Sequence, residues 1–458
     1  MPISRDEEVE LGRSARQRVP RRTFGEWAPT NDRADPVEIL VRQDALRAQG
    51  LVPIRHGRMS ASAFTFYRGA AAVMAADLAP LPRSGLEVQL CGDAHLSNLG
   101  VFGSPSRELL FDLNDFDETL RGPFEWDVLR LAASFEIATR SVGFGRSTRT
   151  AITATVVQAY REAIADFSAM GPLAVWYSRL DAEVWAETAN QPAAAARRVK
   201  ATLEGARKRT SLQAVKKLTK EVDGRLQFVN DPPLLVPLTT IADEIGGVDR
   251  VREAIRATYL EYRSSLPDAH CHLLTHYEVT DVAHKVVGVG SVGLRAYIVL
   301  LQGRNDRDPL VLQVKEAGRS VLEDHLAESP YAHHGRRVVE GQRMMQAASD
   351  IFLGWSTSEG DGRQYYWRQL RDMKASAEVE TMKPQGLTSY AKMCGWSLAR
   401  AHARSGSPIA LAAYLGTSDS FDRSVAEFAT RYADQTELDH LAHLAAITDG
   451  RVTSTPNL

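Results

Sequence analysis

The most restrictive feature of this sequence is a change of character at residues 277–317, YEVTDVAHKVVGVGSVGLRAYIVLLQGRNDRDPLVLQVKEA. Runs of β-branched and aromatic residues alternate there with glycine-containing turns, which favours strands over helices. The segment GRNDRDP separates two of these runs and indicates a hairpin loop. We therefore expect three antiparallel strands, placed after a first half whose apolar residues recur mostly at helical spacing.

The same stretch contains a GxGxxG pattern, formed by Gly288, Gly290 and Gly293 with Ser291 among them. In a dinucleotide-binding fold a helix follows such glycines, whereas the residues that follow here, LRAYIVLL, predict a strand. Glycines between two strands let backbone N–H groups approach phosphates closely. The pattern thus predicts a phosphate-covering loop that binds a nucleotide through these four residues.

Lys315 lies within the apolar run LVLQVKEA. An ammonium group is costly to bury unless it meets an anion, so this position favours a phosphate partner. The alternative is a lysine that extends to solvent at the end of a strand. Glu340, the one early carboxylate of the next helical segment, is the predicted partner of Lys315, although glutamates in helices usually face water.

Oxygen ligands are concentrated at residues 91–119, CGDAHLSNLGVFGSPSRELLFDLNDFDET. Proteins hold magnesium with one or two carboxylates beside substrate phosphates, and Asp93, Asn98, Asp115 and Asp117 supply such groups. Each of them alone has a simpler explanation, since Asp and Asn cap turns. Together with a buried lysine they indicate phosphoryl transfer, in which a carboxylate accepts the hydroxyl proton and a lysine orients the phosphates.

Composition limits the other classes of function. At 458 residues the chain exceeds the length at which one core usually stops growing, so two lobes are the default expectation. Lys and Arg (55) balance Asp and Glu (57), which gives no bulk attraction to nucleic acid or to an anionic membrane. The three cysteines are far apart, which predicts a reducing, cytoplasmic compartment. The apolar runs are too short to span a bilayer.

The expected organisation has five parts, beginning with a charged, proline-punctuated arm that has at most one short helix and no role in the chemistry. The basic stretch at 191–220 is open to two interpretations, a solvated helix or an anion-binding face. The parts are an N-terminal arm (1–55), the catalytic-loop and metal-site part of a large lobe (56–190), a basic helical and hairpin insertion (191–276), a nucleotide-binding small lobe (277–380) and C-terminal helices of the large lobe (381–458).

Several motifs resemble those of known phosphotransferases. GDAHLSN is similar to the GDxHxxN loop of aminoglycoside and choline phosphotransferases, and Asp93 and Asn98 have the spacing of HRDxxxxN in protein kinases. NDFD resembles the DFG or DFD metal-binding segment of that superfamily, and WDVLRL the Asp-Leu-Ala helix start that follows it. YYWRQL resembles the strand that enters the hinge, where Gln369 is expected to contact the nucleotide.

This resemblance implies an α+β, two-lobed protein kinase-like fold that binds ATP and Mg²⁺. Asp112 and Asp115 compete for the metal, because the spacing from Asn98 favours the former and the Asp-Phe-Asp pattern the latter, and we assign Asp115. Cys91 stands where kinases usually have His. The implied roles are Asp93 as base, His95 as orienting residue of the loop, Asn98, Asp115 and Asp117 as metal ligands, Lys315 as phosphate-orienting lysine and Glu340 as its partner.

The chain order departs from that of kinases, in which the glycine loop and lysine precede the catalytic loop. We therefore expect a circular permutation. In that case the helix that normally runs into the catalytic loop lies at the far end of the chain, and residues 387–404, LTSYAKMCGWSLARAHAR, resemble it. The unpermuted competitor is the helix expected at residues 61–79.

Over most of its length the chain also resembles the uncharacterised bacterial domain of unknown function 2252 family. Segments that carry this resemblance are GDAHLSNLG, FDLNDFDET, GVGSVGLR, LQVKEA, EGQRMMQAASDIFLGW and RQLRDMK. The expected function is transfer of the γ-phosphate of ATP to a hydroxyl of an unknown small molecule or protein. Transfer of AMP to a protein hydroxyl and non-catalytic nucleotide binding are the alternatives.

Overall fold

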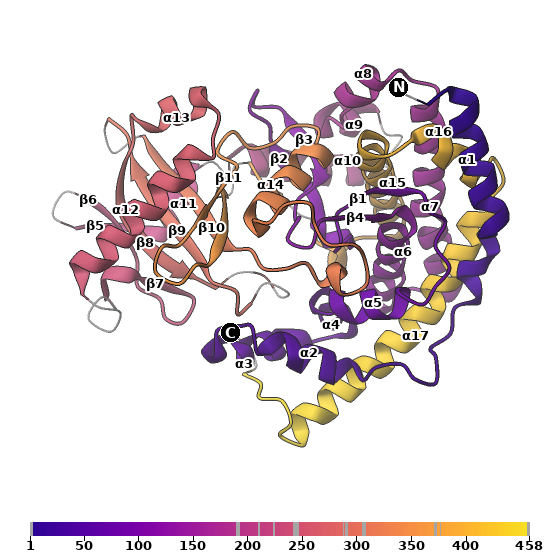
Figure 1. The fold of residues 1–458 in the computed structure, drawn as a ribbon, viewed down its shortest axis with the longest axis horizontal. Coiled ribbons are helices and arrows are strands. Elements are labelled where there is room, and N and C mark those ends of the chain that lie inside the picture. The colour runs from indigo at the N-terminus through magenta and orange to yellow at the C-terminus, as the bar shows by residue number, and fades with distance from the viewer. Residues whose placement is uncertain are drawn as a thin grey trace.

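The protein is a mixed α+β chain in which a large helical region stands beside a smaller region built around a sheet (Figure 1). This confirms the expected fold class at the level of α+β. The structure is a computed structural model that describes residues 3–188, 193–208, 211–222, 225–240, 247–286, 288, 292–304, 308–370, 373–375 and 377–455.

The smaller region contains a six-stranded antiparallel sheet in the order β11-β12-β10-β9-β8-β7. Its strands are β7 (Leu235–Pro237), β8 (Glu278–Lys285), β9 (Ala296–Gln302), β10 (Pro309–Glu316), β11 (Gly354–Thr357) and β12 (Gln364–Gln369). The three strands predicted within residues 277–317 are confirmed as β8, β9 and β10. Because β7 comes earlier in the chain, the sheet begins before residue 277.

Helices cover both faces of this sheet, as the alternation of side chains along β9 requires. Val299 and Leu301 pack in the cluster that includes Tyr262 of α12, whereas Ile298 packs with Val215 of α11 on the other face. The ring of Tyr262 stacks on Trp367 with centroids 4.3 Å apart. The covering helices are α11 (Ser211–Leu218), α12 (Val248–Ser264), α13 (Asp268–Leu274) and α14 (His334–Met345).

The helical region surrounds α6, whose residues are buried nearly all round, as an apolar helix at the centre of a bundle must be. The helix start expected at WDVLRL is confirmed within α6, and the helix expected at 387–404 is confirmed as α15. The helices of this region are α6 (Phe124–Ser141), α7 (Arg146–Ser168), α8 (Pro172–Tyr177), α9 (Ala182–Thr188), α10 (Ala193–Lys208), α15 (Pro384–Ser405), α16 (Pro408–Leu415) and α17 (Ser420–Thr448).

Short hairpins accompany these helices. The segments LEVQL and RELLFDL contain the strands β1 and β3, which belong to different hairpins, since β1 pairs with β4 and β3 with β2. The strands outside the main sheet are β1 (Glu87–Leu90), β2 (Leu99–Gly103), β3 (Leu109–Leu113), β4 (Leu120–Pro123), β5 (Thr219–Val222) and β6 (Arg225–Phe228). The helix expected at 61–79 is divided at Ala70.

The expectation of a solvated N-terminal arm is wrong. Residues 5–69 contain the helices α1 (Arg5–Arg18), α2 (Pro36–Asp44), α3 (Val52–Ser60) and α4 (Ala63–Gly69), and α5 (Ala71–Leu78) follows. Trp27 is buried against Tyr432 of α17, with ring centroids 5.0 Å apart. The charges that suggested solvation are used inside the fold, since Arg33 forms ion pairs with Asp77 and Asp439 at 2.7 and 2.6 Å.

Candidate functional site

The loop between β1 and β2, residues 91–98, is held by the first turn of α6. The carboxylate of Asp127 accepts hydrogen bonds from the backbone N–H groups of Cys91 and Gly92, at 2.6 and 3.0 Å. Gly92 has a φ of 84°, and a Cβ there would clash with the backbone oxygen of Glu118. The helix start that resembles Asp-Leu-Ala thus fixes the backbone of the candidate catalytic loop.

Asp93 is oriented by a buried arginine. The Nε of Arg130 donates to Oδ1 of Asp93 at 2.7 Å, and the guanidinium lies over the ring of Tyr67, 4.5 Å from its centroid. The Asp93 side chain keeps 22% of its surface exposed. We did not predict Arg130 from the sequence, although its position three residues after Asp127 places both on one face of α6.

His95 is a neutral neighbour of Asp93. Its Nε2 lies 3.8 Å from Oδ2 of Asp93, beyond hydrogen-bond distance. Burial, together with the charges of Arg68 and Arg130, holds the pKa of His95 well below its usual value. Backbone hydrogen bonds within residues 93–98 shape the loop, so an orienting role for the His95 ring stays a prediction.

Asn98 joins the loop to the acidic segment after β3. Its side-chain amide donates to the backbone oxygen of Asp93 at 2.8 Å, and its own backbone oxygen accepts from the N–H of Asn114 at 2.8 Å. The thiol of Cys91 donates to the backbone oxygen of Asp115 at 3.2 Å. The loop and the segment at 114–117 therefore form one unit, in which the amide oxygen of Asn98 is the atom suited to a cation.

Lys315, in the middle of the sheet, meets this unit. Its Nζ lies 2.5 Å from Oδ2 of Asp117 and 3.9 Å from Oδ1 of Asp115, and the lysine side chain is 3% exposed. The hydroxyl of Tyr366, on the neighbouring strand β12, donates to Asp117 at 2.6 Å. The predicted meeting of a buried lysine with early acidic residues is what the structure contains.

The two carboxylates have opposite pKa shifts. Burial acts to raise the pKa of Asp117, but the Lys315 charge and the hydrogen bonds from Lys315 and Tyr366 outweigh it and lower this pKa to about 2. Burial and the Asp117 charge raise the pKa of Asp115. Burial lowers the pKa of Lys315, yet both carboxylates outweigh it and raise this pKa overall. Asp117 is thus held in its ionised form, whereas an added cation would stabilise the ionised form of Asp115.

Glu340 is not the partner of Lys315. Its carboxylate lies 3.2 Å from the guanidinium of Arg343, one turn further along α14. The helix turns Arg337 inward instead, and this buried arginine donates to the backbone oxygens of Asp117 and Thr119, at 2.8 and 2.6 Å. α14 therefore supports the acidic segment through a cation that binds its backbone.

Asp112 has a structural role. Both it and Arg400 of α15 are about 1% exposed, and the guanidinium donates to both carboxylate oxygens, at 2.8 and 2.7 Å. The same carboxylate accepts the backbone N–H of Ala347 at 2.8 Å. Of the two competing aspartates, Asp115 is the one that lies beside Lys315.

The glycine loop lies against the N-terminal helices, a contact that sequence reasoning missed. Gly293, with a φ of 94°, accepts the N–H of Ala48 through its backbone oxygen at 2.8 Å. A Cβ at Gly293 would press on the side chain of Arg47. Arg58 donates to the backbone oxygen of Gly288. Of the predicted phosphate-binding residues, Gly290 and Ser291 lie outside the described residues.

A cavity of about 1000 Å³ opens between the sheet and the helical region, at the upper end of the size range of small-molecule pockets. The predicted hinge residue Gln369 lines it, together with Arg368 and Asn114. Arg368 donates to the side chain of Gln313 at 3.0 Å and to the backbone oxygen of Asn114 at 3.1 Å. The cavity therefore adjoins the segment that carries Asp115.

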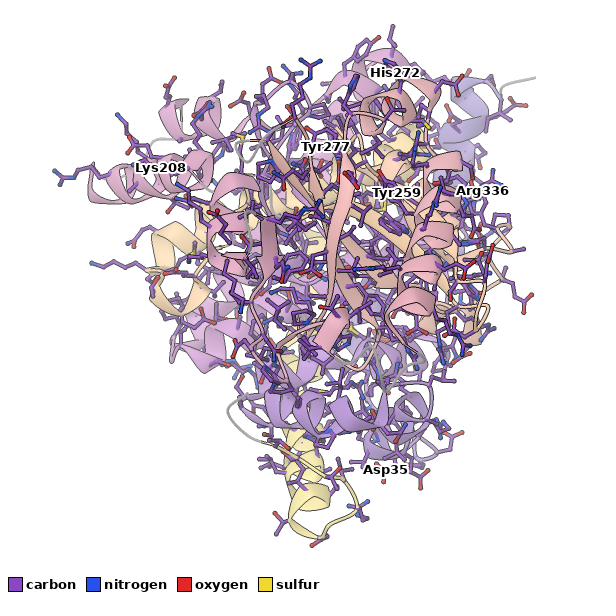
Figure 2. All side chains as sticks on the ribbon, turned by 90° about the vertical axis from the view of Figure 1, so that its left-hand side faces the viewer. Asp35, Lys208, Tyr259, His272, Tyr277 and Arg336 are labelled. Atoms are coloured by element: carbon purple, nitrogen blue, oxygen red, sulfur yellow. The ribbon has the colours of Figure 1, made fainter. Side chains whose placement is uncertain are left out.

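The two helices of the basic stretch lie in different surroundings, and anion binding by either stays a prediction. Lys208, at the end of α10, extends away from the body of the protein (Figure 2). Lys217 of α11 lines the cavity instead. Solvation therefore accounts for the first helix, and the second brings a positive charge to the cavity.

The end of α15 adjoins β1, the strand that enters the candidate catalytic loop. The N–H of Gln89 donates to the hydroxyl of Ser405 at 3.0 Å, and a Cβ at Gly406 would touch the side chain of Val88. Nε2 of His402 lies 3.4 Å from the carboxylate of Asp127, the residue that anchors the loop. A helix more than three hundred residues later in the chain thus ends where β1 begins.

The fold and the site define a mixed α+β protein in which a buried lysine of the sheet meets an acidic loop beside a cavity that could hold a small molecule. The chain belongs to the family described as uncharacterized protein conserved in bacteria (DUF2252), whose model matches residues 47–446. Neither the curated proteins nor the solved structures gave a match to the chain. Within the described residues, none of the helices combines the length and apolarity needed to cross a bilayer.

Proposed function

We propose that this protein is an ATP- and Mg²⁺-dependent phosphotransferase that moves the γ-phosphate to a hydroxyl of a small molecule or protein. The observation that carries the proposal is the 2.5 Å contact between Lys315 and Asp117, which joins the sheet to the acidic loop next to Asp93. In phosphotransferases of the kinase type, a lysine on the third strand and the acidic loop flank the phosphates in this way.

The strand and helix order supports a two-lobed kinase-like architecture. Lys315 lies on β10, the third strand of an antiparallel meander, and the next helix is α14. β12 neighbours β10 and ends at Gln369 on the cavity wall. The contact of Ser405 with Gln89 supports a circular permutation, because joining α15 to β1 would restore the kinase order of helix, strand and catalytic loop.

The donor set suits magnesium. Asp115, Asp117 and the amide oxygen of Asn98 are hard oxygen ligands, and phosphate oxygens would complete the coordination. The raised pKa of Asp115, caused by burial and by the Asp117 charge, indicates a carboxylate that a further cation would favour. Bound Mg²⁺ would supply neutralisation of the charge on the phosphates.

The protein residues have distinct tasks in the proposed transfer. Asp93, fixed by Arg130, accepts the proton of the attacking hydroxyl. The bond from that oxygen to the γ-phosphorus forms while the bond between the γ-phosphorus and the bridging oxygen breaks, and ADP leaves. Lys315 orients the phosphates, and Gln369, which lines the cavity, would contact the adenine base.

An incubation with Mg-ATP labelled separately at the α- and γ-phosphates tests the proposal. The purified protein is mixed with a pool of hydroxyl-bearing metabolites, and the expected result is γ-label on an acceptor while the α-label stays in ADP. α-Label attached to protein would instead indicate AMP transfer. Binding of ATP without movement of either label would indicate a non-catalytic module.

A further inference from the structure

Arg68 is a partly buried arginine on the helix next to Asp93. It belongs to α4, and the preceding residue, Tyr67, accepts a hydrogen bond from Arg130 through its backbone oxygen at 3.1 Å. The hydroxyl of Tyr67 in turn donates to the backbone oxygen of Arg130 at 2.7 Å. The end of α4 is thus fixed to the arginine that holds Asp93.

The guanidinium of Arg68 differs from those of Arg130 and Arg400, two buried arginines near the site, in having no carboxylate partner within the described part of the chain. Arg130 and Arg400 are each paired with a carboxylate. The Nε of Arg68 is buried without a hydrogen-bond partner, and among the described residues no carboxylate lies within ion-pair distance of its guanidinium. Desolvating a cation that makes neither an ion pair nor a hydrogen bond is costly, which points to an anion supplied from outside the chain.

The surroundings place this charge at the reacting end of the site. Burial lowers the pKa of Arg68, and the nearby charges of Asp93, Glu380 and Asp115 act against that shift. The Arg68 charge also helps to lower the pKa of His95, after the larger effect of burial. Arg68 therefore lies near both the candidate base and a candidate metal ligand, on the helical side of the site, whereas Lys315 approaches from the sheet.

We propose that Arg68 binds the phosphoryl group being transferred, through charge-assisted hydrogen bonds to its equatorial oxygens. This inference rests on the proposed function. A guanidinium is suited to the task because it presents several donors in one plane and stays charged. Negative charge is spread over those oxygens during transfer, so Arg68 would stabilise it from the helical region while Lys315 does so from the sheet.

The anion has two conceivable sources, the γ-phosphate of the nucleotide and an anionic group on the acceptor. Titration calorimetry with Mg-ADP and with the Mg²⁺ complex of the β,γ-imido analogue of ATP separates them, because only the analogue carries a γ-phosphate. The proteins to compare are the wild type, Arg68→Met, Arg68→Lys and the control Arg83→Met. Arg83 is exposed and donates to the backbone oxygens of Ala79 and His325.

The expected result is a loss of about tenfold or more in the affinity of Arg68→Met for the analogue, with the affinity for Mg-ADP changed by less than about twofold. Arg68→Lys should recover part of the loss, and Arg83→Met should bind both ligands like the wild type. Unchanged analogue binding in Arg68→Met would overturn the inference in favour of an acceptor group. Equal losses for both ligands, with a lower Tm, would assign Arg68 a structural role.

Failure of the proposed function is visible in the same titrations. If the wild type binds neither nucleotide, the phosphotransferase proposal fails and the role of Arg68 fails with it. If the wild type binds both and Arg68→Met behaves identically, only the inference about Arg68 is overturned.

Discussion

The ammonium of Lys315 lies 2.5 Å from a carboxylate oxygen of Asp117, a residue 198 positions earlier in the chain. The lysine is the next-to-last residue of β10, paired with Ala296 on β9 and Tyr366 on β12. Its side chain is buried, so it does not reach solvent at the end of its strand. Its charge is balanced by two carboxylates that are suited to a metal. In the proposed complex, the oxygens of a bound triphosphate replace the carboxylates as partners of the Lys315 ammonium. The following predictions depend on that replacement.

Lys315→Met should weaken Mg-ATP binding or turnover by about tenfold or more, because the phosphates lose their orienting charge. Calorimetry and steady-state kinetics measure the two quantities. Glu340→Gln is the matched control, since Glu340 pairs with Arg343, and it should bind and turn over ATP within about twofold of the wild type. Normal nucleotide kinetics in Lys315→Met would remove that lysine from the site.

Asp93→Asn should abolish transfer while nucleotide still binds. The amide cannot accept the hydroxyl proton, and general bases contribute roughly 10² to 10⁴-fold to rates. The amide oxygen can still accept from Arg130, which keeps the loop in place. Turnover is measured beside the Kd for Mg-ATP and the Tm. Unchanged turnover would show that Asp93 is not the base.

Asp112→Asn and Asp115→Asn should have opposite effects. The first leaves the buried charge of Arg400 without its carboxylate and should lower the free energy of unfolding by about 3 kcal/mol or more. The second removes a negative charge that is repelled by Asp117, so the free energy of unfolding should stay unchanged. The affinity for Mg²⁺ should fall by about tenfold. Denaturant unfolding and Mg²⁺ titration at fixed ATP distinguish them. The reverse pattern would assign the metal to Asp112.

Stability should rise with pH between about 5 and 7 because of His443. Its Nε2 lies 2.9 Å from Nδ1 of His56, whose Nε2 lies 2.7 Å from Asp44. Burial, then the charges of His56, His440 and Arg55, lower the pKa of His443 to about 3, against the opposing charge of Asp44. In the unfolded chain, His443 binds a proton when the pH falls below the ordinary histidine pKa of about 6.5. In the folded chain it does not bind one in this range.

The folded state therefore loses stability as the pH falls from about 6.5 towards 3, by up to about 2 kcal/mol at pH 5. Free energies of unfolding measured at pH 5 and pH 7 test this. His443→Gln should flatten the pH dependence, whereas His272→Gln, at an exposed position on α13, should keep it. Equal slopes in the two variants would exclude His443 as the source.

Local patterns predicted much of the fold, because strand and helix periodicities depend on neighbouring residues alone. The meander at 277–317 and the helix α15 are examples. The meeting of Lys315 with the acidic segment was predictable for a related reason, since a lysine in an apolar strand needs an anion and the anions were concentrated in one loop.

The predicted pairing of Lys315 with Glu340 was wrong because it depends on how a helix is rotated and packed against the sheet. Glu340 and Arg337 are three positions apart on α14, and only the phase of that helix against the sheet decides which faces inward. The prediction of a solvated N-terminal arm was wrong for another reason. Charged residues of this arm form buried ion pairs such as Arg33 with Asp77, and composition cannot distinguish these from solvated charges.

A crystal structure with Mg²⁺ and the β,γ-imido analogue of ATP tests the central claim most directly. The account predicts the adenine base in the cavity beside Gln369, the metal at Asp115, Asp117 and Asn98, and Lys315 turned from Asp117 towards the phosphates. A cavity that stays empty at saturating analogue, or an analogue bound elsewhere with the contact between Lys315 and Asp117 unchanged, would contradict it.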